Sequence, residues 1–220
     1  MPLPTDWFPD WSGDIVVLVA SGPSAPQVRL AAARGKAKFI AVNNSWRLAP
    51  WSDVLYSCDF SWWNAYDDWH QFAGLKVSIE YRTSEKWPEI RRMECQKIND
   101  FVDFSPDARI GWGGNSGFGA INLAVKFGAK RLILVGYDMT LSHGPHWHGK
   151  HKVGMHNPLP ANVRRWRRAI DNAEPSLKAH GVRILNASPI SGLEAYPKIG
   201  FEEALKTFLE EETDVRCVAG

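Results

Sequence analysis

The chain has few cysteines, and they are not arranged to build a metal site or a disulfide framework. Only three occur, Cys58, Cys95 and Cys217, and none belongs to a CxxC pair. A sparse, odd set of cysteines is typical of a reducing compartment. No basic stretch precedes the apolar run at 15–20, so the run lacks the layout of a signal peptide, and we expect a cytoplasmic protein.

The sequence also lacks a strong charge of either sign and a long apolar run. Its net charge of +2 at pH 7 gives no support for nucleic acid or a membrane surface as a partner. The run at 15–20 is much shorter than the roughly 20 residues that cross a bilayer, so no membrane span is expected. With 45% hydrophobic residues and no repeats, the composition suits one compact α/β domain over residues 1–220.

Three common binding motifs are absent as well. No GK[ST] follows the glycine turn near residue 22, so this turn is not a P-loop, and neither GxGxxG nor HEXXH occurs. A nucleotide site therefore has to be inferred from the order of strands and turns along the chain.

The most informative segment that is present spans 113–138, GGNSGFGAINLAVKFGAKRLILVGYD. Its pattern predicts a helix that Asn115 or Ser116 caps and that Gly128 ends in the left-handed conformation. A continuous apolar run at 132–135 then predicts a strand that is covered on both faces of a sheet.

Two features of this segment point to a ligand. The N–H groups from Gly114 to Gly117 lie at the expected start of the helix, where an anion binds readily. Asp138 follows the strand, at the carboxyl edge where open α/β sheets bind their ligands. A βα unit without any ligand has the same pattern, so this segment alone leaves both interpretations open.

Three earlier strands, expected at 14–20, 38–42 and 54–57, also end in small or polar residues. These residues are Ser21, Gly22, Pro23 and Ser24 after the first strand, Asn43 and Asn44 after the second, and Asp59 after the third. Because the carboxyl ends of parallel strands meet at one edge of a sheet, these residues together with Asp138 predict a ligand pocket.

Strands and helices alternate through the rest of the chain. After an irregular lead-in at 1–13, we expect helices at 26–34, 61–72, 161–179 (kinked or split at Pro175) and 201–211, strands at 75–79 and 182–185, and a loop-rich excursion with one short helix at 81–110. This alternation predicts a doubly wound, mostly parallel, Rossmann-like sheet with helices on both faces. Tryptophans clustered at 46–69 predict an aromatic core under the loops, with a stacking surface for a base or sugar ring as the alternative.

A histidine-rich loop is expected at 139–160, as part of an active site. It holds five of the seven histidines, at His143, His146, His148, His151 and His156. Imidazole suits proton transfer near neutral pH and also binds zinc, but this spacing fits no standard zinc signature. Most of the five are expected to face solvent. His156 is the best-placed general base, because it lies just before the start of the next helix.

That helix begins with four arginines, Arg164, Arg165, Arg167 and Arg168. They predict either a solvated face, partly paired with Asp171 and Glu174, or a contact to phosphate, whose oxygens match the guanidinium group. The phosphate would belong to a nucleotide donor or to a nucleic-acid acceptor, and the small net charge does not support the second.

The order of these motifs resembles two related families. The motifs are ASGPS at 20–24, VNNSW at 42–46, the Asp59 strand end, the 113–138 unit and a later histidine before a helix. The chain resembles the bacterial sialyltransferases that use a CMP-activated sugar, and also the archaeal 6-hydroxymethyl-pterin pyrophosphokinase-like family. The resemblance covers roughly residues 14–186, and the short chain also looks similar to phage-encoded members of the group.

The resemblance implies a role for each matching residue. The turn from Ser21 to Ser24 approaches the nucleotide phosphates or ribose, and Asn43 and Asn44 contact the ribose or base. Ser116 and Gly117 meet the donor phosphate or a sugar carboxylate, Asp138 closes the nucleotide site, and His156, within GMHNPLP, resembles the general base.

The departures divide between the two families. Ala20 and Ser21 stand where the sialyltransferases have Gly and Asn, Asp59 replaces an Asn, and the tyrosines that support their donor phosphate have no clear match. Asp59 and the double glycine resemble the pyrophosphokinase-like group, whereas His156 resembles the sialyltransferases.

We therefore expect a nucleotide-dependent transferase that moves a sugar from a CMP-activated donor to an unidentified acceptor. The alternative enzyme binds ATP and Mg²⁺, with Asp59 and Asp138 as the carboxylate ligands. A third reading is a non-catalytic binding or assembly protein on the same fold.

Overall fold

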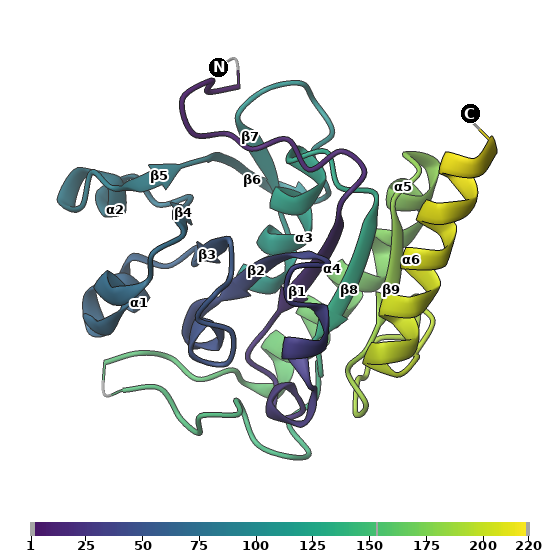
Figure 1. The fold of residues 1–220 in the computed structure, drawn as a ribbon. Coiled ribbons are helices and arrows are strands. Elements are labelled where there is room, and N and C mark those ends of the chain that lie inside the picture. Colours follow the sequence, from purple (N-terminus) through teal and green to yellow (C-terminus); the bar gives the residue numbers. More distant parts are fainter. Residues whose placement is uncertain (1–2, 153, 219–220) are drawn as a thin grey trace.

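The computed structural model describes residues 3–152 and 154–218, with side chains through Glu211. Seven strands form one sheet in the order β5-β4-β3-β2-β1-β8-β9, and every neighbouring pair is parallel (Figure 1). The strands are β1 Ile15–Val19, β2 Lys38–Val42, β3 Val54–Tyr56, β4 Leu75–Ser78, β5 Ile90–Arg92, β8 Arg131–Val135 and β9 Arg183–Asn186. This arrangement confirms the expected mostly parallel α/β sheet.

Strands β1 and β8 are neighbouring interior strands of the sheet, and their side chains pack on both faces. All five residues of β1 are buried. Val16 and Leu18 pack with α3 (Ser116–Lys126), α4 (Pro160–Asn172) and α5 (Glu174–Ala179) on one face. Ile15, Val17 and Val19 pack on the other face with α6 (Phe201–Val218) and a short 3₁₀ helix. Helices therefore cover both faces, as predicted, because alternate residues of a strand point to opposite sides.

Two predicted helices are wrong in extent. The helix expected at 26–34 is two separate 3₁₀ helices, Ala25–Gln27 and Leu30–Ala33, because Val28 between them is extended. The helix expected at 61–72 ends early: α1 spans Phe60–Ala65, Tyr66 is extended, and a 3₁₀ helix follows at Asp68–Gln71. In both cases the apolar residues are buried as the pattern predicts, but one extended residue, Val28 or Tyr66, interrupts the helix.

The region expected to be loop-rich contains three strands besides the predicted short helix, α2 (Tyr81–Lys86). Strand β5 extends the main sheet, and β6 (Glu94–Asp100) pairs with β7 (Arg109–Trp112) in a separate parallel ribbon. Strand β6 has the sequence ECQKIND and is half-exposed or exposed along its whole length. It therefore lacks the apolar alternation by which a strand is recognised.

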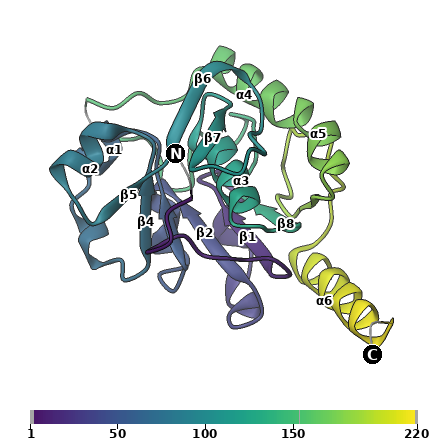
Figure 2. The ribbon, with the colours of Figure 1, turned by 90° about the horizontal axis from the view of Figure 1, so that it is seen from above.

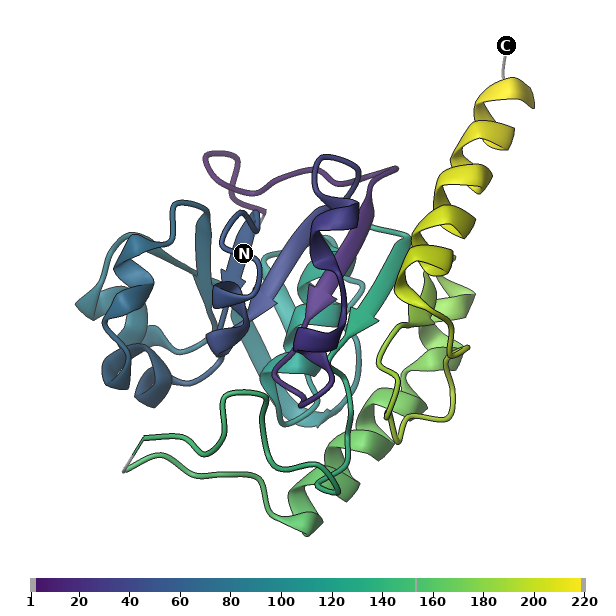
Figure 3. The ribbon, with the colours of Figure 1, turned by 60° about the horizontal axis from the view of Figure 1, so that its bottom comes forward.

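The carboxyl-terminal elements follow the prediction closely. Helices α4 and α5 divide at Ala173, two residues before Pro175, and α6 extends beyond the predicted end at 211 to Val218. Figure 2 shows α6 at one end of the sheet and α1 with α2 at the other. Between β8 and α4, the described residues form no helix or strand, and Figure 3 shows this long segment running along one end of the molecule.

The clustered tryptophans of α1 and of the 3₁₀ helix that follows it pack into an aromatic core. This confirms the predicted aromatic core. Trp62, Trp63 and Trp69 are almost completely buried. Their rings meet edge to face, with centroids 5.0 Å apart for Trp62 and Trp63 and 5.2 Å apart for Trp63 and Trp69. This core braces the turn that follows β3.

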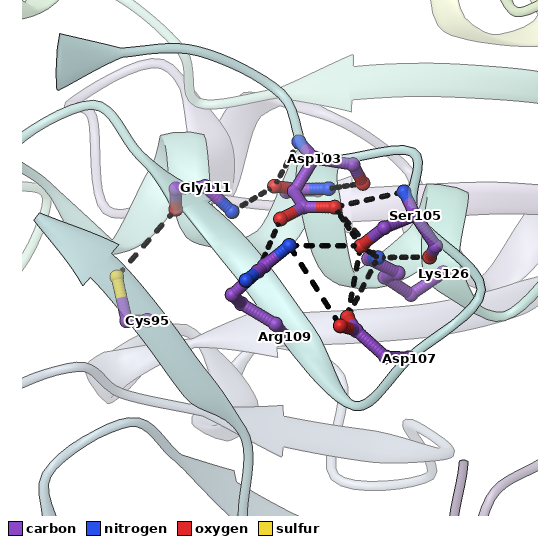
Figure 4. A network of polar contacts seen from close by, with 8 residues as sticks. Cys95, Asp103, Ser105, Asp107, Arg109, Gly111 and Lys126 are labelled. Atoms are coloured by element: carbon purple, nitrogen blue, oxygen red, sulfur yellow. Dashed lines mark hydrogen bonds and ion pairs between the residues drawn. The ribbon is translucent and has the colours of Figure 1, made fainter. Parts of the chain in front are cut away.

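A network of buried charges lies between β7 and the carboxyl-terminal end of α3 (Figure 4). Asp103 accepts hydrogen bonds from Arg109 Nε at 2.7 Å and from Lys126 Nζ at 3.0 Å. Burial opposes ionisation of Asp103, but the hydrogen bonds from Ser105, Arg109 and Lys126 outweigh it and lower its pKa well below the usual value. The network ties the β6–β7 ribbon to α3.

Candidate functional site

A cavity of about 330 Å³ opens at the carboxyl ends of β1, β2, β3 and β8. It is closed on its other sides by the start of α3, the segment after β8 and the start of α4. All of the sequence-predicted site residues line this cavity except Ser24 and Asn44. The lining residues among them are Ser21, Gly22, Pro23, Asn43, Asp59, Gly114, Asn115, Ser116, Gly117, Asp138 and His156.

Asp138, which follows β8, holds the turn after β1 in place. Its carboxylate accepts hydrogen bonds from the backbone N–H of Ser24, at 2.8 Å, and from the Ser24 hydroxyl. A Cβ on Gly22 would lie 2.6 Å from the same carboxylate, so the chain can approach Asp138 this closely only with glycine. Burial raises the pKa of Asp138, and the hydrogen bonds from Ser24 oppose that change. Ser24 is thus inside the wall of the cavity, holding its shape.

The start of α3 presents backbone donors to the cavity. The Asn115 side chain caps the helix by accepting a hydrogen bond from Phe118 N at 2.9 Å, as predicted. The first N–H groups of a helix have no partner in a preceding turn, so those of Ser116 and Gly117 remain for a ligand. The Tyr137 hydroxyl donates to Gly117 O at 2.9 Å and holds the helix start in place. This geometry suits an anion such as phosphate.

Backbone strain and an unmet hydrogen bond also mark the cavity. Asn43 (φ 52°) and Met139 (φ 47°) are the non-glycine residues with positive φ in the described part of the chain, and both line the cavity. The side-chain oxygen of Asn43 is buried without a hydrogen-bond partner. Left-handed non-glycine residues are uncommon and cluster at functional sites, and a buried acceptor without a partner is free to bond a ligand.

Asn44 points away from the cavity, into the aromatic core. Its Oδ1 accepts a hydrogen bond from Trp62 Nε1 at 3.1 Å, and its Nδ2 lies 3.0 Å from His148 Nε2. Neighbouring residues at a strand end face different ways, which the sequence pattern did not resolve. Direct ligand contact by Ser24 and Asn44 stays a prediction that their burial does not favour.

The predicted histidine-rich loop brings three of its imidazoles to the cavity. His146 and His151 line it from the segment after β8, and His156 lines it from a more exposed position near α4. The prediction missed several lining residues on β7 and α4, notably Trp112, Asn162 and Trp166. Trp166 lies on α4 together with the buried residues Val163 and Ile170, so only the packing of the helix shows that it borders the site.

The four arginines of α4 are partly paired. Arg165 Nη2 lies 2.6 Å from Asp100 Oδ1, and its other amino nitrogen donates to Gly113 O at 3.4 Å. Arg167 forms ion pairs with Asp171, as predicted, and with Glu194. Arg164 and Arg168 are exposed. Phosphate contact by this face stays a prediction.

Asp59 and Asp138, the carboxylates predicted as Mg²⁺ ligands, both line the cavity, and each oxygen of Asp138 already accepts one hydrogen bond from Ser24. Among the residues that the structure describes, no group of three or more His, Cys, Asp and Glu side chains is arranged to hold a metal ion.

Within the same described residues, no helix is both long enough and apolar enough to cross a membrane.

The chain matches no protein-family model and no curated protein sequence. Its fold is similar to that of the MAf glycosyltransferase from Magnetospirillum magneticum AMB-1, with a TM-score of 0.60 at 12% identity over 93% of this chain and 38% of the other. It is also similar to the sialyltransferase CstII from Campylobacter jejuni in complex with CMP-3FNeuAc, with a TM-score of 0.54 at 11% identity over 85% of this chain and 86% of the other. A CstII structure with cytidine-5'-monophosphate gives a TM-score of 0.52 at 10% identity over 90% of this chain and 98% of the other. The chain covers well under half of the length of the MAf glycosyltransferase. It has the α/β fold that these glycosyltransferases, CstII included, share.

Proposed function

We propose that this protein is a glycosyltransferase that moves a sugar from a CMP-activated donor to an acceptor that is still to be identified. The observation that carries the proposal is the meeting, across one cavity, of the Gly22 turn and the start of α3 at the carboxyl edge of the sheet. Support comes from the fold, which is like that of a sialyltransferase whose structures hold CMP or a CMP-sugar analogue.

The geometry suggests how the donor would lie in a single nucleotide-binding domain. The N–H groups of Ser116 and Gly117 would hold the phosphate, and the unpartnered oxygen of Asn43 would accept a hydrogen bond from the ribose or base. Asp138 acts at one remove, by fixing the turn at Gly22.

The reaction would be a direct displacement at the sugar. His156, exposed at the mouth of the cavity, would take the proton of the acceptor hydroxyl as that oxygen bonds to the sugar carbon. The bond from this carbon to the phosphate oxygen would break, and the helix N–H groups would stabilise the charge on the departing CMP.

A thermal-shift panel of CMP, CDP, UMP, GDP and ATP, each with and without Mg²⁺, tests the nucleotide. We expect CMP to stabilise the protein without metal, by about 2.7 kcal/mol at 100 times its dissociation constant. Stabilisation by ATP only when Mg²⁺ is present would instead favour a pyrophosphokinase-like enzyme. No shift with any nucleotide would favour a protein without turnover.

A further inference from the structure

Three histidines of the segment after β8 pack against one another beside the cavity. The ring centroids of His146 and His148 are 5.1 Å apart, those of His146 and His151 are 4.4 Å apart, and those of His148 and His151 are 5.3 Å apart. We name these three residues the histidine cluster, and residues 139–152 the cover segment, because six residues of this segment line the cavity.

The cluster attaches the cover segment to the body of the protein. His148 Nε2 lies 3.0 Å from Asn44 Nδ2, whose orientation is fixed because Trp62 donates to the other atom of the same amide. This amide nitrogen is therefore the donor, and His148 must present an unprotonated Nε2 to accept its hydrogen bond. His151 Nδ1 lies 3.4 Å from the Tyr66 hydroxyl, at the end of α1.

The charges around the cluster oppose protonation more than they favour it. Arg47 lies close enough to lower the pKa of His148, although Asp68 pairs with this arginine at 2.6 Å. Lys152 lies over the Tyr66 ring, 4.7 Å from its centroid. Asp59 is the one nearby carboxylate that raises the pKa of His151. The neighbouring histidines also lower the pKa of His146 and of His148, because two positive charges this close together would repel each other.

We propose that the histidine cluster is a pH-sensitive latch, which holds the cover segment over the cavity at neutral pH and releases it on acidification. Neutral His146 and His148 stack and His148 accepts the hydrogen bond from Asn44, whereas charged rings would repel one another and lose this bond. The inference rests on the contacts of the cluster and is independent of which ligand enters the cavity.

The direction and size of the effect follow from the pKa values of the two states. Burial, with the neighbouring histidines next, lowers the pKa of His146 to about 3, and burial, His151 and Arg47 lower that of His148 to about 4. In an open segment both return to the usual value of 6.5. Closure is therefore fully favoured above about pH 6.5 and weakens below it, by roughly tenfold per ring between pH 7.5 and pH 5.5.

Amide hydrogen exchange of the ligand-free protein tests this inference. Trp147 N–H, which donates to Ser21 O at 3.0 Å, reports on closure. After correction for the intrinsic effect of pH, we expect its protection to fall about 100-fold from pH 7.5 to pH 5.5 as His146 and His148 titrate. The amides of β1 and β8 should keep their protection, which separates opening of the segment from global unfolding.

The variant His146→Gln/His148→Gln/His151→Gln should lose this pH dependence, whereas His180→Gln should keep it, because His180 stacks on Phe104 outside the cluster. Titration of the imidazole carbon-bound protons of the wild-type protein by NMR gives a second measure that needs no variant. Equal protection of Trp147 at both pH values, or an ordinary pKa near 6.5 for all three rings without any opening, overturns the latch.

Discussion

The two ends of helix α3 lie in polar surroundings of opposite kinds. At its carboxyl-terminal end Lys126 and Asp103 are both buried, and each charge has a partner at hydrogen-bond distance (Figure 4). At its amino-terminal end the cavity contains two buried polar atoms without hydrogen-bond partners, Asn43 Oδ1 and His146 Nε2, and two residues in left-handed backbone.

This difference separates a structural cluster from the binding site that we propose. A buried polar group that lacks a partner costs free energy, so folded proteins satisfy nearly all of them. The charged network obeys this rule and stabilises the ribbon against α3. Among the described residues, seven buried side-chain atoms have no hydrogen-bond partner, and two of them, Asn43 Oδ1 and His146 Nε2, belong to residues that line the cavity, where a ligand of the kind that we propose would complete the missing bonds.

The largest expected effect is at the cavity end. His156→Ala should lower turnover by roughly 10²–10⁴-fold, the usual contribution of a positioned general base, with little change in donor affinity. Steady-state kinetics with the confirmed donor would measure it, and His143→Ala is the matched control from the same loop. Full activity of His156→Ala, with a loss in His146→Ala or His151→Ala instead, would move the base to another imidazole.

The charged end should respond in stability rather than in binding. Asp103→Asn removes the nearer of the two carboxylates beside the buried Lys126 and leaves only Asp107 at 3.8 Å, so it should cost up to about 3–5 kcal/mol of unfolding free energy, measured in urea, with nucleotide affinity per folded molecule unchanged. Asp107→Asn, at the more exposed end of the network, should cost much less. A change in affinity as large as the change in stability would remove the distinction between the two ends.

The same network predicts how stability depends on acid. Because the folded protein lowers the pKa of Asp103, this contribution is fully present above the unfolded value of about 3.9 and is lost as the pH falls below it. Urea midpoints measured between pH 6 and pH 3 should fall more steeply for the wild-type protein than for Asp103→Asn. Parallel curves would mean that Asp103 ionises alike in both states.

Gly22→Ala should disturb the cavity by a moderate amount. Its Cβ would collide with the backbone oxygen of Gly136 and with the Asp138 carboxylate, so we expect a loss of about 1–3 kcal/mol together with weaker CMP binding. Gly200→Ala is the matched control, because its Cβ would have open space, and it should change stability by less than about 0.5 kcal/mol. Calorimetry of both variants with and without CMP tests the pair.

The smallest expected effect has opposite signs for stability and binding. Asn43→Gly removes the left-handed strain and the buried unpaired oxygen, so the protein should unfold no more easily, or should gain up to about 1 kcal/mol. The same change should weaken CMP binding, because the acceptor is lost. Loss of stability with unchanged affinity would show that Asn43 serves the fold alone.

Local features of the fold were predictable from the sequence because the signals are contained in short stretches. The apolar runs of β1, β2 and β8 predict strands that are covered on both faces. Helix α3 begins after its cap Asn115 and ends before Gly128 in the left-handed conformation, as the capping rules predict. The meeting of four strand ends at one cavity also followed, since parallel strands share their carboxyl edge.

Tertiary structure alone decided the features that depend on distant partners. Strand β6 is stabilised by pairing with β7 and not by its own pattern, and Ser24 and Asn44 turn inward because Asp138 and Trp62 are there to bond them. The histidine cluster is set in the same way, since loop residues acquire their partners only when the chain has folded. The sequence by itself therefore determined six of the seven strands of the main sheet, the turns that follow its central strands and the location of the candidate site. Long-range hydrogen bonds and packing determined β5, β6 and β7, and also which polar side chains support the wall of the cavity and which face into it.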